Sequence, residues 1–353
     1  MESSPEKVPP QGRGMGTRML LALSGTPDSG TRDTRKVITM PGNEIMSIGE
    51  LIVEVMRKEV DVPLSVAGDF VGPFPSGAPA IFADQAVRLG HSVGFIGSCG
   101  ADDFGDCLVS RFEADGLDAS TVRRVEGIAT GVAFVTYFSN GDRRFLFHIA
   151  NSAAGHLPEP TPEMFEGTKW LHICGSTLSA GEDMREKCYR ACELAVAAGA
   201  KVSFDPNLRP ELLGGEEALR RVCKPVMDVA ALVLPSSSEA EILSGVAGAD
   251  EACRALLAGA AEVVALKQGS AGCKVYCADG EYEVPAFPVQ AVDPTGAGDC
   301  FDAGFVVGLL EGKHPREAGK LANACGALGA TRKGPMEGAL PLADVLEFVQ
   351  RQP

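Results

Sequence analysis

The pattern of apolar and polar residues changes sharply near residue 44. Before that point, residues 1–43 are rich in Pro, Gly, Ser, Thr and Arg and show neither a helical nor a strand period. Their one apolar run, Met19–Ala22, is too short for the core of a signal peptide. We therefore expect a disordered extension over 1–43, with a weak transit peptide as the alternative. Because Met40 stands just before the first predicted strand and Met46 at its start, a later start codon would remove most of this extension.

From Glu44 onward, short apolar runs alternate with amphipathic stretches, which is typical of a mostly parallel sheet with helices on both faces. The predicted core strands are Ile45–Ile48, Leu51–Val55, Val93–Gly97, Trp170–Cys174, Lys201–Phe204, Ala231–Leu234 and Val263–Leu266, followed by an antiparallel pair at Cys273–Tyr276 and Tyr282–Phe287. The predicted helices are Ala80–Leu89, Phe104–Ala114, 181–198, 216–228, 238–244, 249–258, 297–310, 315–330 and 341–350. The expected fold class is a three-layer α/β sandwich.

Two further strands do not fit this alternation and flank Asn140-Gly141, a strong hairpin signal. They cover Gly131–Phe138 and Arg143–Phe147, and irregular strand-like pieces also fall within residues 60–76. We predict a small β-sheet inserted into the core, with its strands within about 56–76 and 128–150, lying as a lid over the active site.

The charge balance excludes one large class of partners. Lys and Arg number 32 against 47 Asp and Glu, which gives a formal net charge of −15 over 353 residues. Such an acidic surface repels nucleic acid and anionic lipid, both of which need a basic face. No apolar run reaches the roughly 20 residues that a bilayer span needs. We expect neither a nucleic-acid partner nor a membrane partner.

The 11 cysteines include no CxxC pair, and the CxxxC pairs Cys188/Cys192 and Cys273/Cys277 have no histidine beside them. Zinc binding is therefore not expected. Free thiols packed as small apolar side chains in a reducing compartment explain these cysteines, so we expect a cytoplasmic protein.

The most informative segment, DPTGAGDCFDAG (residues 293–304), joins a glycine-rich turn, an acid and an apolar helix. Gly296 and Gly298 let an anion approach the first backbone N–H groups of the helix, which have no partner within it. This forms an anion hole suited to the charge on a transferred phosphoryl group. Asp299 would lie beside it, within reach of an attacking hydroxyl, where a carboxylate of ordinary pKa suffices as base. A plain helix N-cap is the alternative.

Two further acids accompany this turn. Asp293 precedes the loop and could bind a monovalent cation, whereas Asp302 is interpreted as a solvated or helix-start charge. Other enzyme classes are excluded by spacing, since the chain has no Walker A motif, no Gly-x-Gly-x-x-Gly that opens a helix and no Gly-x-Ser-x-Gly.

The segment resembles the C-terminal motif of the ribokinase/PfkB family of carbohydrate kinases. An N-terminal counterpart is present as SGAPAIFA (76–83), RLG (88–90) and GSCGADDFG (97–105). The resemblance implies one ribokinase-like domain over 44–353, a central sheet with flanking helices and a β-sheet lid. It also implies ATP with Mg²⁺ and transfer of the γ-phosphoryl group to a sugar hydroxyl.

The resemblance assigns roles residue by residue. Asp299 matches the catalytic base, and the anion hole matches Gly296, Ala297 and Gly298. Asp293 and Thr295 match positions that hold a K⁺-like ion, and Glu239 matches an acid that holds Mg²⁺ through water. Positions associated with the nucleotide are Lys267, Gly269, Gly272, Asn207, Ser236 and Asn323, the last near the adenine. Positions associated with the sugar are Glu54, Ser76, Gly77 and Arg209, although Glu54 and Arg209 could also be ordinary edge or surface charges.

Three positions depart from the family pattern. Ile81 stands where the family usually has an Asn that contacts sugar, and Ser236 begins Ser-x-x-Glu where the family has Asn-x-x-Glu. Ile149 stands where kinases of 2-keto-3-deoxy acids often carry Arg, so a sugar-acid carboxylate would lack a bidentate partner. We therefore favour a neutral sugar, and a ketohexose first because SGAPAIF also resembles tagatose kinases.

Other functions stay open at this point. A nucleoside kinase or a 2-keto-3-deoxy sugar-acid kinase of the same family is the enzyme alternative, although aromatic residues near the lid are few for a nucleobase (Phe70, Phe74, Tyr137, Phe147). A non-catalytic sugar sensor on the same fold is the alternative from another class, and the retained anion-hole turn speaks against it. Lid sheets in this family often pair, so we expect a homodimer through the lid. His148 is expected to face the lid cavity.

Overall fold

The computed structural model describes residues 42–140, 142–149, 151–208 and 213–352, and every structural statement below concerns these residues. The expected extension over 1–43 lies outside them, except for Gly42 and Asn43. The Asn43 side chain donates a hydrogen bond of 2.8 Å to Asp118, so the folded unit includes Asn43.

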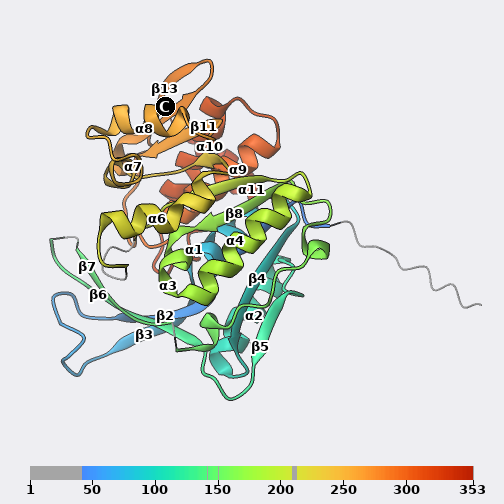
Figure 1. Cartoon of the computed structure of the whole chain (residues 1–353). Helices are drawn as coiled ribbons and strands as arrows, with labels where there is room; N and C mark the ends of the chain where they lie inside the picture. The colour runs from blue at the N-terminus through green and yellow to red at the C-terminus, as the bar shows by residue number, and fades with distance from the viewer. Residues whose placement is uncertain (1–41, 141, 150, 209–212, 353) are drawn as a thin grey trace, which may run out of the picture. The chain divides into compact units, whose positions relative to one another are not determined.

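A nine-stranded sheet forms the centre of the folded unit, in the order β13-β12-β11-β10-β9-β8-β1-β4-β5 (Figure 1). Its strands are β1 (Ile45–Ile48), β4 (Val93–Gly100), β5 (Val122–Val125), β8 (Trp170–Cys174), β9 (Lys201–Asp205), β10 (Ala230–Val233), β11 (Val263–Lys267), β12 (Gly272–Cys277) and β13 (Gly280–Pro285). The strands from β11 to β5 run parallel, and β12 and β13 add the predicted antiparallel pair at one edge. The sequence predicts all of these strands except β5, whose polar sequence VRRV gives no strand pattern.

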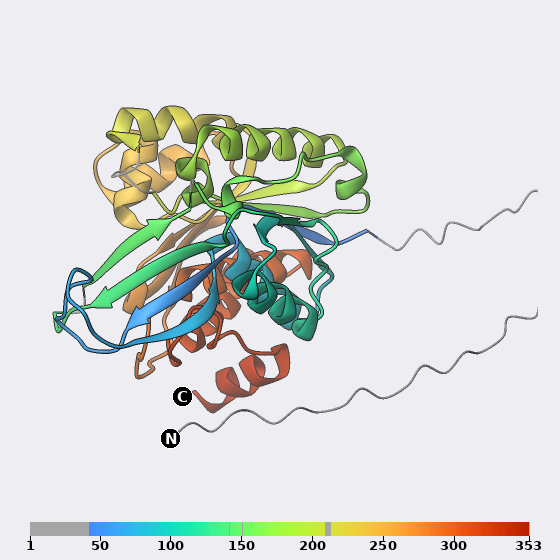
Figure 2. The same ribbon diagram turned by 90° about the horizontal axis from the view of Figure 1, so that it is seen from below.

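Helices cover both faces of this sheet (Figure 2). One face carries α1 (Ala78–Arg88), α2 (Asp103–Asp115), α9 (Ala297–Leu310), α10 (Pro315–Gly329) and α11 (Leu342–Arg351). The other carries α3 (Gly175–Ala180), α4 (Glu182–Ala197), α6 (Glu216–Met227), α7 (Ser237–Ser244) and α8 (Ala249–Leu257). Three short 3₁₀ turns complete the set at η1 (Ala153–Gly155), η2 (Pro162–Phe165) and η3 (Gly269–Ala271). A separate buried apolar cluster lies under each helical layer, so the predicted three-layer α/β sandwich is confirmed.

A second sheet of four strands projects from the central sheet, in the order β3-β2-β6-β7 (Figures 1 and 2). Its strands are β2 (Ile52–Arg57), β3 (Phe70–Ser76), β6 (Gly131–Tyr137) and β7 (Arg143–His148), and we call it the lid sheet. The predicted inserted sheet is therefore confirmed. The prediction that 51–55 forms a core strand is wrong, because β2 pairs with β3 and β6. Apolar periodicity reports that a strand is buried but not which sheet it joins.

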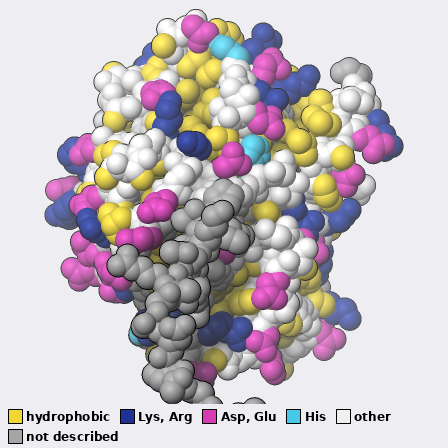
Figure 3. Space-filling model, turned by 90° about the vertical axis from the view of Figure 1, so that its right-hand side faces the viewer, with side chains coloured by type: hydrophobic (Ala, Val, Ile, Leu, Met, Phe, Trp, Pro, Cys, Tyr) yellow, Lys and Arg dark blue, Asp and Glu magenta, His cyan; other side chains and the backbone are white. Residues whose placement is uncertain are grey.

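The surface carries both signs of charge. Basic and acidic side chains are interspersed over the face seen in Figure 3. Among the described helices, none combines the length and the apolar character that crossing a membrane requires. All 11 cysteines lie within the described residues as free thiols, and ten of them are buried. They pack as small apolar side chains, as predicted.

Candidate active site

The carboxyl ends of β8, β9, β10 and β11 converge on one cavity of about 450 Å³. This volume falls in the range of roughly 300–1,000 Å³ that is typical of small-molecule sites. Ligands of open α/β sheets bind at this edge. The strand ends and the turns after them supply Ser176, Asp205, Asn207, Ser236 and Lys267. The lid sheet supplies Glu54, Ser76, Ala133, Arg143, Phe145 and Phe147, and the start of α9 supplies Gly296, Gly298 and Asp299.

Glycines shape the N-terminus of α9. Gly296 has φ +81°, and a Cβ at this position would lie 2.3 Å from the Pro335 carbonyl oxygen, so a larger residue would clash. At Gly298 a Cβ would meet only Lys267 Nζ, at 3.8 Å, which leaves the backbone open to an anion. Both glycines line the cavity, whereas the N–H of Ala297 turns back to the Pro294 carbonyl at 3.3 Å. The backbone that a phosphoryl group could approach therefore lies at Gly298, and we call it the anion cradle.

Asp299 lies in the first turn of α9, buried, with its side chain in the wall of the cavity. It directly follows Gly298, so a carboxylate stands next to the cradle. Cys174 Sγ and carboxylate oxygens of Asp205 and Asp299 lie within 4.8 Å of one another. Burial raises the pKa of the Cys174 thiol well above its ordinary value, so this neighbour is neutral and adds no negative charge at Asp299.

A partly buried lysine, Lys267, links β9, β11 and α9 near the cradle. Lys267 Nζ lies 2.8 Å from Asp205 Oδ1 and 3.2 Å from Asp302 Oδ1. Burial alone would lower the pKa of Lys267, but the two carboxylates raise it above its ordinary value, so the side chain is an ammonium. Burial and the Asp205 charge raise the pKa of Asp302 well above 3.8. Although burial opposes ionisation of Asp205, the Lys267 ammonium holds its pKa below that value. Of the two acids, Asp302 therefore keeps a proton to higher pH than Asp205 does.

This triad corrects one sequence interpretation. Asp302 is fully buried and ion-paired, so it is not a solvated or helix-start charge. The sequence carries a signal for this burial, since the helix around Asp302 is apolar on every side, with Cys300, Phe301, Ala303 and Phe305 all buried. An acid inside such a helix needs a buried partner.

Asp293 is buried just before the glycine turn and is held by neutral donors. Its carboxylate accepts hydrogen bonds from Thr295 N (3.0 Å), Gly334 N (3.1 Å) and the Tyr137 hydroxyl (3.1 Å). These donors orient the carboxylate without neutralising it, so the residues present fit a monovalent cation. The Thr295 hydroxyl accepts a hydrogen bond of 2.8 Å from Arg143 of the lid sheet.

Glu54 faces the cavity from β2, in the lid sheet, with only 2% of its surface exposed. One carboxylate oxygen, Oε2, accepts a hydrogen bond of 3.3 Å from Ser76, and the other, Oε1, is buried without a partner. Burial and the neighbouring Asp293 raise the pKa of Glu54 to about 8. A ligand hydroxyl would satisfy the unpartnered oxygen, which fits the predicted sugar contact better than an edge charge.

Gly77 and Ile81, at the start of α1, lie beside Glu54 on the cavity wall. Gly77 has φ +112°, and a Cβ there would lie 2.2 Å from the Glu50 carbonyl oxygen. Ile81 presents an apolar surface where a hydrogen-bonding Asn was the family expectation.

Glu239 and Ser236 cap α7. Glu239 Oε2 accepts hydrogen bonds from Ser236 N (2.8 Å) and Ser236 Oγ (2.7 Å), and Oε1 accepts one from Leu208 N (2.9 Å). This is a capping box, so both residues have a structural function besides the one expected. Oε1 accepts only this one hydrogen bond and so keeps a further lone pair, and Glu239 lines the cavity, which fits Mg²⁺ held through water. Asn207, at φ +36°, lies in the turn after β9 and also lines the cavity.

Three residues predicted to bind nucleotide, Gly269, Gly272 and Asn323, do not line this cavity, and neither do Ala297 and Asp293. Gly272 has φ +104°, and a Cβ there would lie 2.2 Å from the Val284 carbonyl oxygen, so close β12–β13 pairing explains this glycine. Gly269 lies in the turn η3 before it. The Asn323 amide donates to the Val284 and Pro285 carbonyls at 2.9 and 3.1 Å and ties α10 to β13. Arg209 lies outside the described residues.

The sequence interpretation missed several cavity residues. Phe145 and Phe147 alternate along β7 and stack with their centroids 5.3 Å apart, which the period of two would have revealed. His148, between the inward positions 147 and 149, is exposed and packs edge-on to Phe134, so the expectation that it faces the cavity is wrong. Glu50 lines the cavity and accepts a hydrogen bond of 2.6 Å from Ser176, a contact between residues 126 apart that no local pattern reveals.

An open anion cradle at a helix N-terminus, with an acid beside it and a polar cavity in front, defines a small-molecule phosphotransferase. The chain matches the model of the family described as pfkB family carbohydrate kinase over residues 43–342. It is 34% identical over 316 residues to Fructokinase-1 of Oryza sativa subsp. japonica, which covers 87% of this chain and 97% of the rice protein.

Two solved structures are also similar. A putative Ribokinase II from E. coli in complex with ATP and Mg²⁺ is 37% identical, with a TM-score of 0.82, and the match covers 88% of this chain and 100% of that one. The fructokinase of Vibrio cholerae O395 with fructose, ADP and calcium is 25% identical, with a TM-score of 0.73 and coverage of 88% and 99%. The chain belongs to the pfkB family of carbohydrate kinases. It is an ATP-dependent sugar kinase with a ribokinase-like fold, as the sequence motifs predicted.

Proposed function

We propose that this kinase transfers the γ-phosphoryl group of ATP to a hydroxyl of a neutral ketohexose, with Asp299 as the general base. One observation carries the proposal: Asp299 with its cradle and Glu54 with its unpartnered oxygen line the same cavity. A polyhydroxylated molecule can give one hydroxyl to each carboxylate. Ile149 also lines this cavity, so the position offers an apolar side chain and no guanidinium to a sugar-acid carboxylate. The fructokinase names among the relatives agree with this substrate class.

The residues divide the chemical work as follows. Glu54 and Ser76 orient the sugar, which converts the reaction into one between positioned groups. Asp299 accepts the proton of the attacking hydroxyl. The amides around Gly298 stabilise charge on the transferred phosphoryl group, and Glu239 and Asn207 lie where they would hold hydrated Mg²⁺ and nucleotide. When bound, Mg²⁺ neutralises phosphate charge that the acidic chain would otherwise repel.

A coupled assay for ADP across ketohexoses, aldohexoses, pentoses, sugar acids and nucleosides tests the substrate class. We expect the highest kcat/KM with a ketohexose. Running the panel in K⁺ and again in Na⁺ tests the proposed cation site at Asp293 and Thr295, and activity should be higher in K⁺. The sugar-kinase proposal fails if no sugar supports release of ADP, and that result would favour the sensor alternative. A sugar acid as best substrate would overturn the argument from Ile149.

A second candidate substrate class has its own structural support. The stacked pair Phe145 and Phe147 forms an aromatic wall in the cavity, with an interplanar angle of 6°. Such a wall suits a heterocyclic base, because aromatic rings stack on one another. A riboside is therefore the alternative substrate. The nucleosides in the panel decide between the two classes.

Glu54→Gln should weaken sugar binding and remove its pH dependence. A hydrogen bond to a charged group contributes about 1.5–3 kcal/mol, so we expect affinity to fall about tenfold to a hundredfold. The carboxylate form accepts sugar hydroxyls best, so wild-type affinity should rise as pH increases through about 8. Isothermal titration with sugar between pH 6 and 9 measures both effects, and Glu59→Gln, which replaces an exposed acid, is the control. An equal pH dependence in Glu54→Gln and wild type would contradict the assignment.

The same group makes a prediction about stability. The pKa of Glu54 is raised in the folded protein from 4.5 to about 8. Its contribution to folding is therefore fully present below about pH 4.5 and is lost as the pH rises through about 8. Glu54→Gln should match wild type near pH 5 and exceed it in free energy of unfolding near pH 9, measured by urea titration.

We also propose that two copies of the chain pair through the outer face of the lid sheet. We further propose that the protein lies in the cytoplasm. Leu146 is 49% exposed and Phe70 is 39% exposed on this sheet, which a partner copy would cover. The free thiols agree with a reducing compartment. Sedimentation velocity should show a dimer for wild type and a monomer for Leu146→Glu. A monomeric wild type would overturn the pairing, and cell fractionation tests the location.

A further inference from the structure

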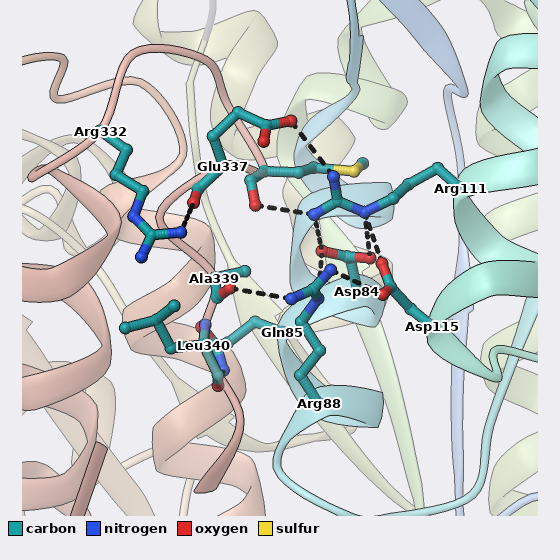
Figure 4. A network of polar contacts seen from close by, with 10 residues as sticks. Asp84, Gln85, Arg88, Arg111, Asp115, Arg332, Glu337, Ala339 and Leu340 are labelled. Atoms are coloured by element: carbon teal, nitrogen blue, oxygen red, sulfur yellow. Dashed lines mark hydrogen bonds and ion pairs between the residues drawn. The ribbon is translucent and has the colours of Figure 1, made fainter. Parts of the chain in front are cut away.

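A network of charged side chains lies outside the cavity, between α1 and α2 (Figure 4). Asp84 is fully buried at its centre. It accepts hydrogen bonds from Arg111 Nε (3.2 Å) and Nη2 (3.0 Å). It also forms an ion pair with Arg88 Nε, at 3.4 Å. Asp115 accepts from Arg88 Nη2 at 2.6 Å and from Arg111 Nε. Burial raises the pKa of Asp84 to about 7, even with both arginines beside it.

The network extends to a segment more than 220 residues away in sequence. Arg111 donates to the Met336 carbonyl at 2.8 Å and to the Glu337 carboxylate at 3.1 Å, and Arg88 donates to the Ala339 carbonyl at 3.2 Å. Gln85 and Leu340 exchange two hydrogen bonds, of 3.0 and 3.3 Å. Residues 334–340, which we call the strap, form turns and no helix or strand. Contacts with α1 and α2 therefore hold the strap where regular secondary structure does not.

The other end of the strap contacts Asp293 and the glycine turn that precedes α9. Gly334 N donates to Asp293 at 3.1 Å. The Pro335 carbonyl oxygen lies 2.3 Å from where a Cβ on Gly296 would be, so it packs directly against the glycine that begins α9. The strap thus runs from the arginine network to the anion cradle and to the candidate cation ligand. A shift of the strap would move both.

The chemistry of the network indicates that its ion pairs serve to position the strap rather than to stabilise the fold. Burying ion pairs rarely stabilises a fold more than apolar side chains of the same volume would. An arginine fork, however, fixes several acceptors in one plane with defined directions, which a lysine cannot do. Arg111 bonds two carboxylates on α1 and α2, a third on the strap and a strap carbonyl at once. Its directional contacts thus determine where the strap lies.

We infer that Arg111 is a positioning residue for phosphoryl transfer, because it fixes the strap and the strap fixes Gly296 and Asp293. This inference rests on the proposed function, in which Gly296 begins the helix whose amides around Gly298 serve the transferred group, and Asp293 holds a cation. It concerns no contact between Arg111 and substrate. A displacement of about 1 Å in a catalytic group can reduce the rate about a hundredfold, so a small movement of the strap suffices.

Arg111→Lys tests the inference, because it keeps the charge and removes the fork. Gln85→Ala is a second variant that releases the strap at Leu340 without changing any charge. Arg190→Lys on α4, whose partner is the exposed Glu193 at 3.0 Å, is the matched control. The measurements are kcat, the KM of the sugar and of ATP, the urea midpoint, and hydrogen exchange of peptides covering 292–301 and 330–340.

For Arg111→Lys we expect kcat to fall about tenfold to a hundredfold, with the sugar KM within about twofold of wild type. The kcat of Gln85→Ala should also fall, by a smaller factor, and the kcat of the control Arg190→Lys should not change. Hydrogen exchange should become faster in both peptides. Unchanged exchange at 292–301, or a loss of kcat that merely follows the unfolded fraction, would overturn the inference. A wild type without sugar-dependent release of ADP would refute the proposed function instead, and the exchange data would still decide the positioning.

Discussion

Asp299→Asn is expected to reduce kcat by about two to four orders of magnitude while leaving sugar affinity near that of wild type. Asparagine has almost the same shape but cannot take the proton of the attacking hydroxyl. In the proposed function Glu54 and Ser76 of the lid sheet hold the sugar, so its binding should not depend on Asp299. Steady-state kinetics with the best sugar of the panel, together with isothermal titration of that sugar, separate the two effects.

Asp302→Asn is the matched control for this substitution, since it makes the same change one turn further along the same helix. Burial and the Asp205 charge raise the pKa of Asp302 well above 3.8, which favours its neutral form. An amide reproduces the neutral carboxyl, and kcat should stay within about threefold of wild type. Undiminished turnover in Asp299→Asn would rule out its role as base. An equal loss in both variants would indicate that the helix start is sensitive to any change of acid.

Sequence patterns anticipated those parts of the structure that local chemistry determines. Helix α9 begins and ends where the glycine turn and the apolar run predicted, over 297–310. The anion hole follows from the same local signals, because positive φ and close backbone approach restrict Gly296 to glycine. Alternation in β7 also contained the inward direction of Phe145 and the outward direction of His148. The wrong expectation for His148 came from assigning it a place at the cavity, although the alternation along β7 already indicated that it points outward.

Other features depend on contacts between distant segments, which one sequence does not report. Strand β2 shows the burial pattern of a core strand, and only its pairing with β3 and β6 assigns it to the lid sheet. In the sequence Arg111 looks like an ordinary charged residue of a helix. The residues that it contacts, Met336 and Glu337, lie 225 and 226 positions away along the chain. Sequence analysis therefore indicated candidate residues for the chemical step but not the distant residues that contact their surroundings.

Lys267→Met is expected to lower the free energy of unfolding by about 3–5 kcal/mol near pH 7, because it leaves a buried carboxylate without its cation. Methionine keeps the length and the apolar stem, so the loss is one of charge. The Lys267 ammonium lowers the pKa of Asp205 in the folded protein against the effect of burial. This stabilisation is present above the ordinary pKa of 3.8 and is lost as pH falls through the folded value. The difference between wild type and variant should therefore persist down to about pH 4 and shrink only below it, as measured by urea titration.

The double variant Lys267→Met with Asp205→Asn separates the structural role of the lysine from its predicted contact with nucleotide. It removes both charges of the Lys267–Asp205 pair, so no carboxylate of that pair is left without its cation and most of the lost stability should return. Activity should not return, because Lys267 Nζ lies 3.8 Å from the Cβ position of Gly298, where the phosphoryl group would lie. We expect the KM of ATP to rise and kcat to fall in both variants. Asp205→Asn alone, which keeps the ammonium, is the control for any separate effect of that carboxylate. A stable double variant with wild-type kinetics would show that Lys267 serves the fold alone, and a stable single variant would contradict the charge balance of the triad.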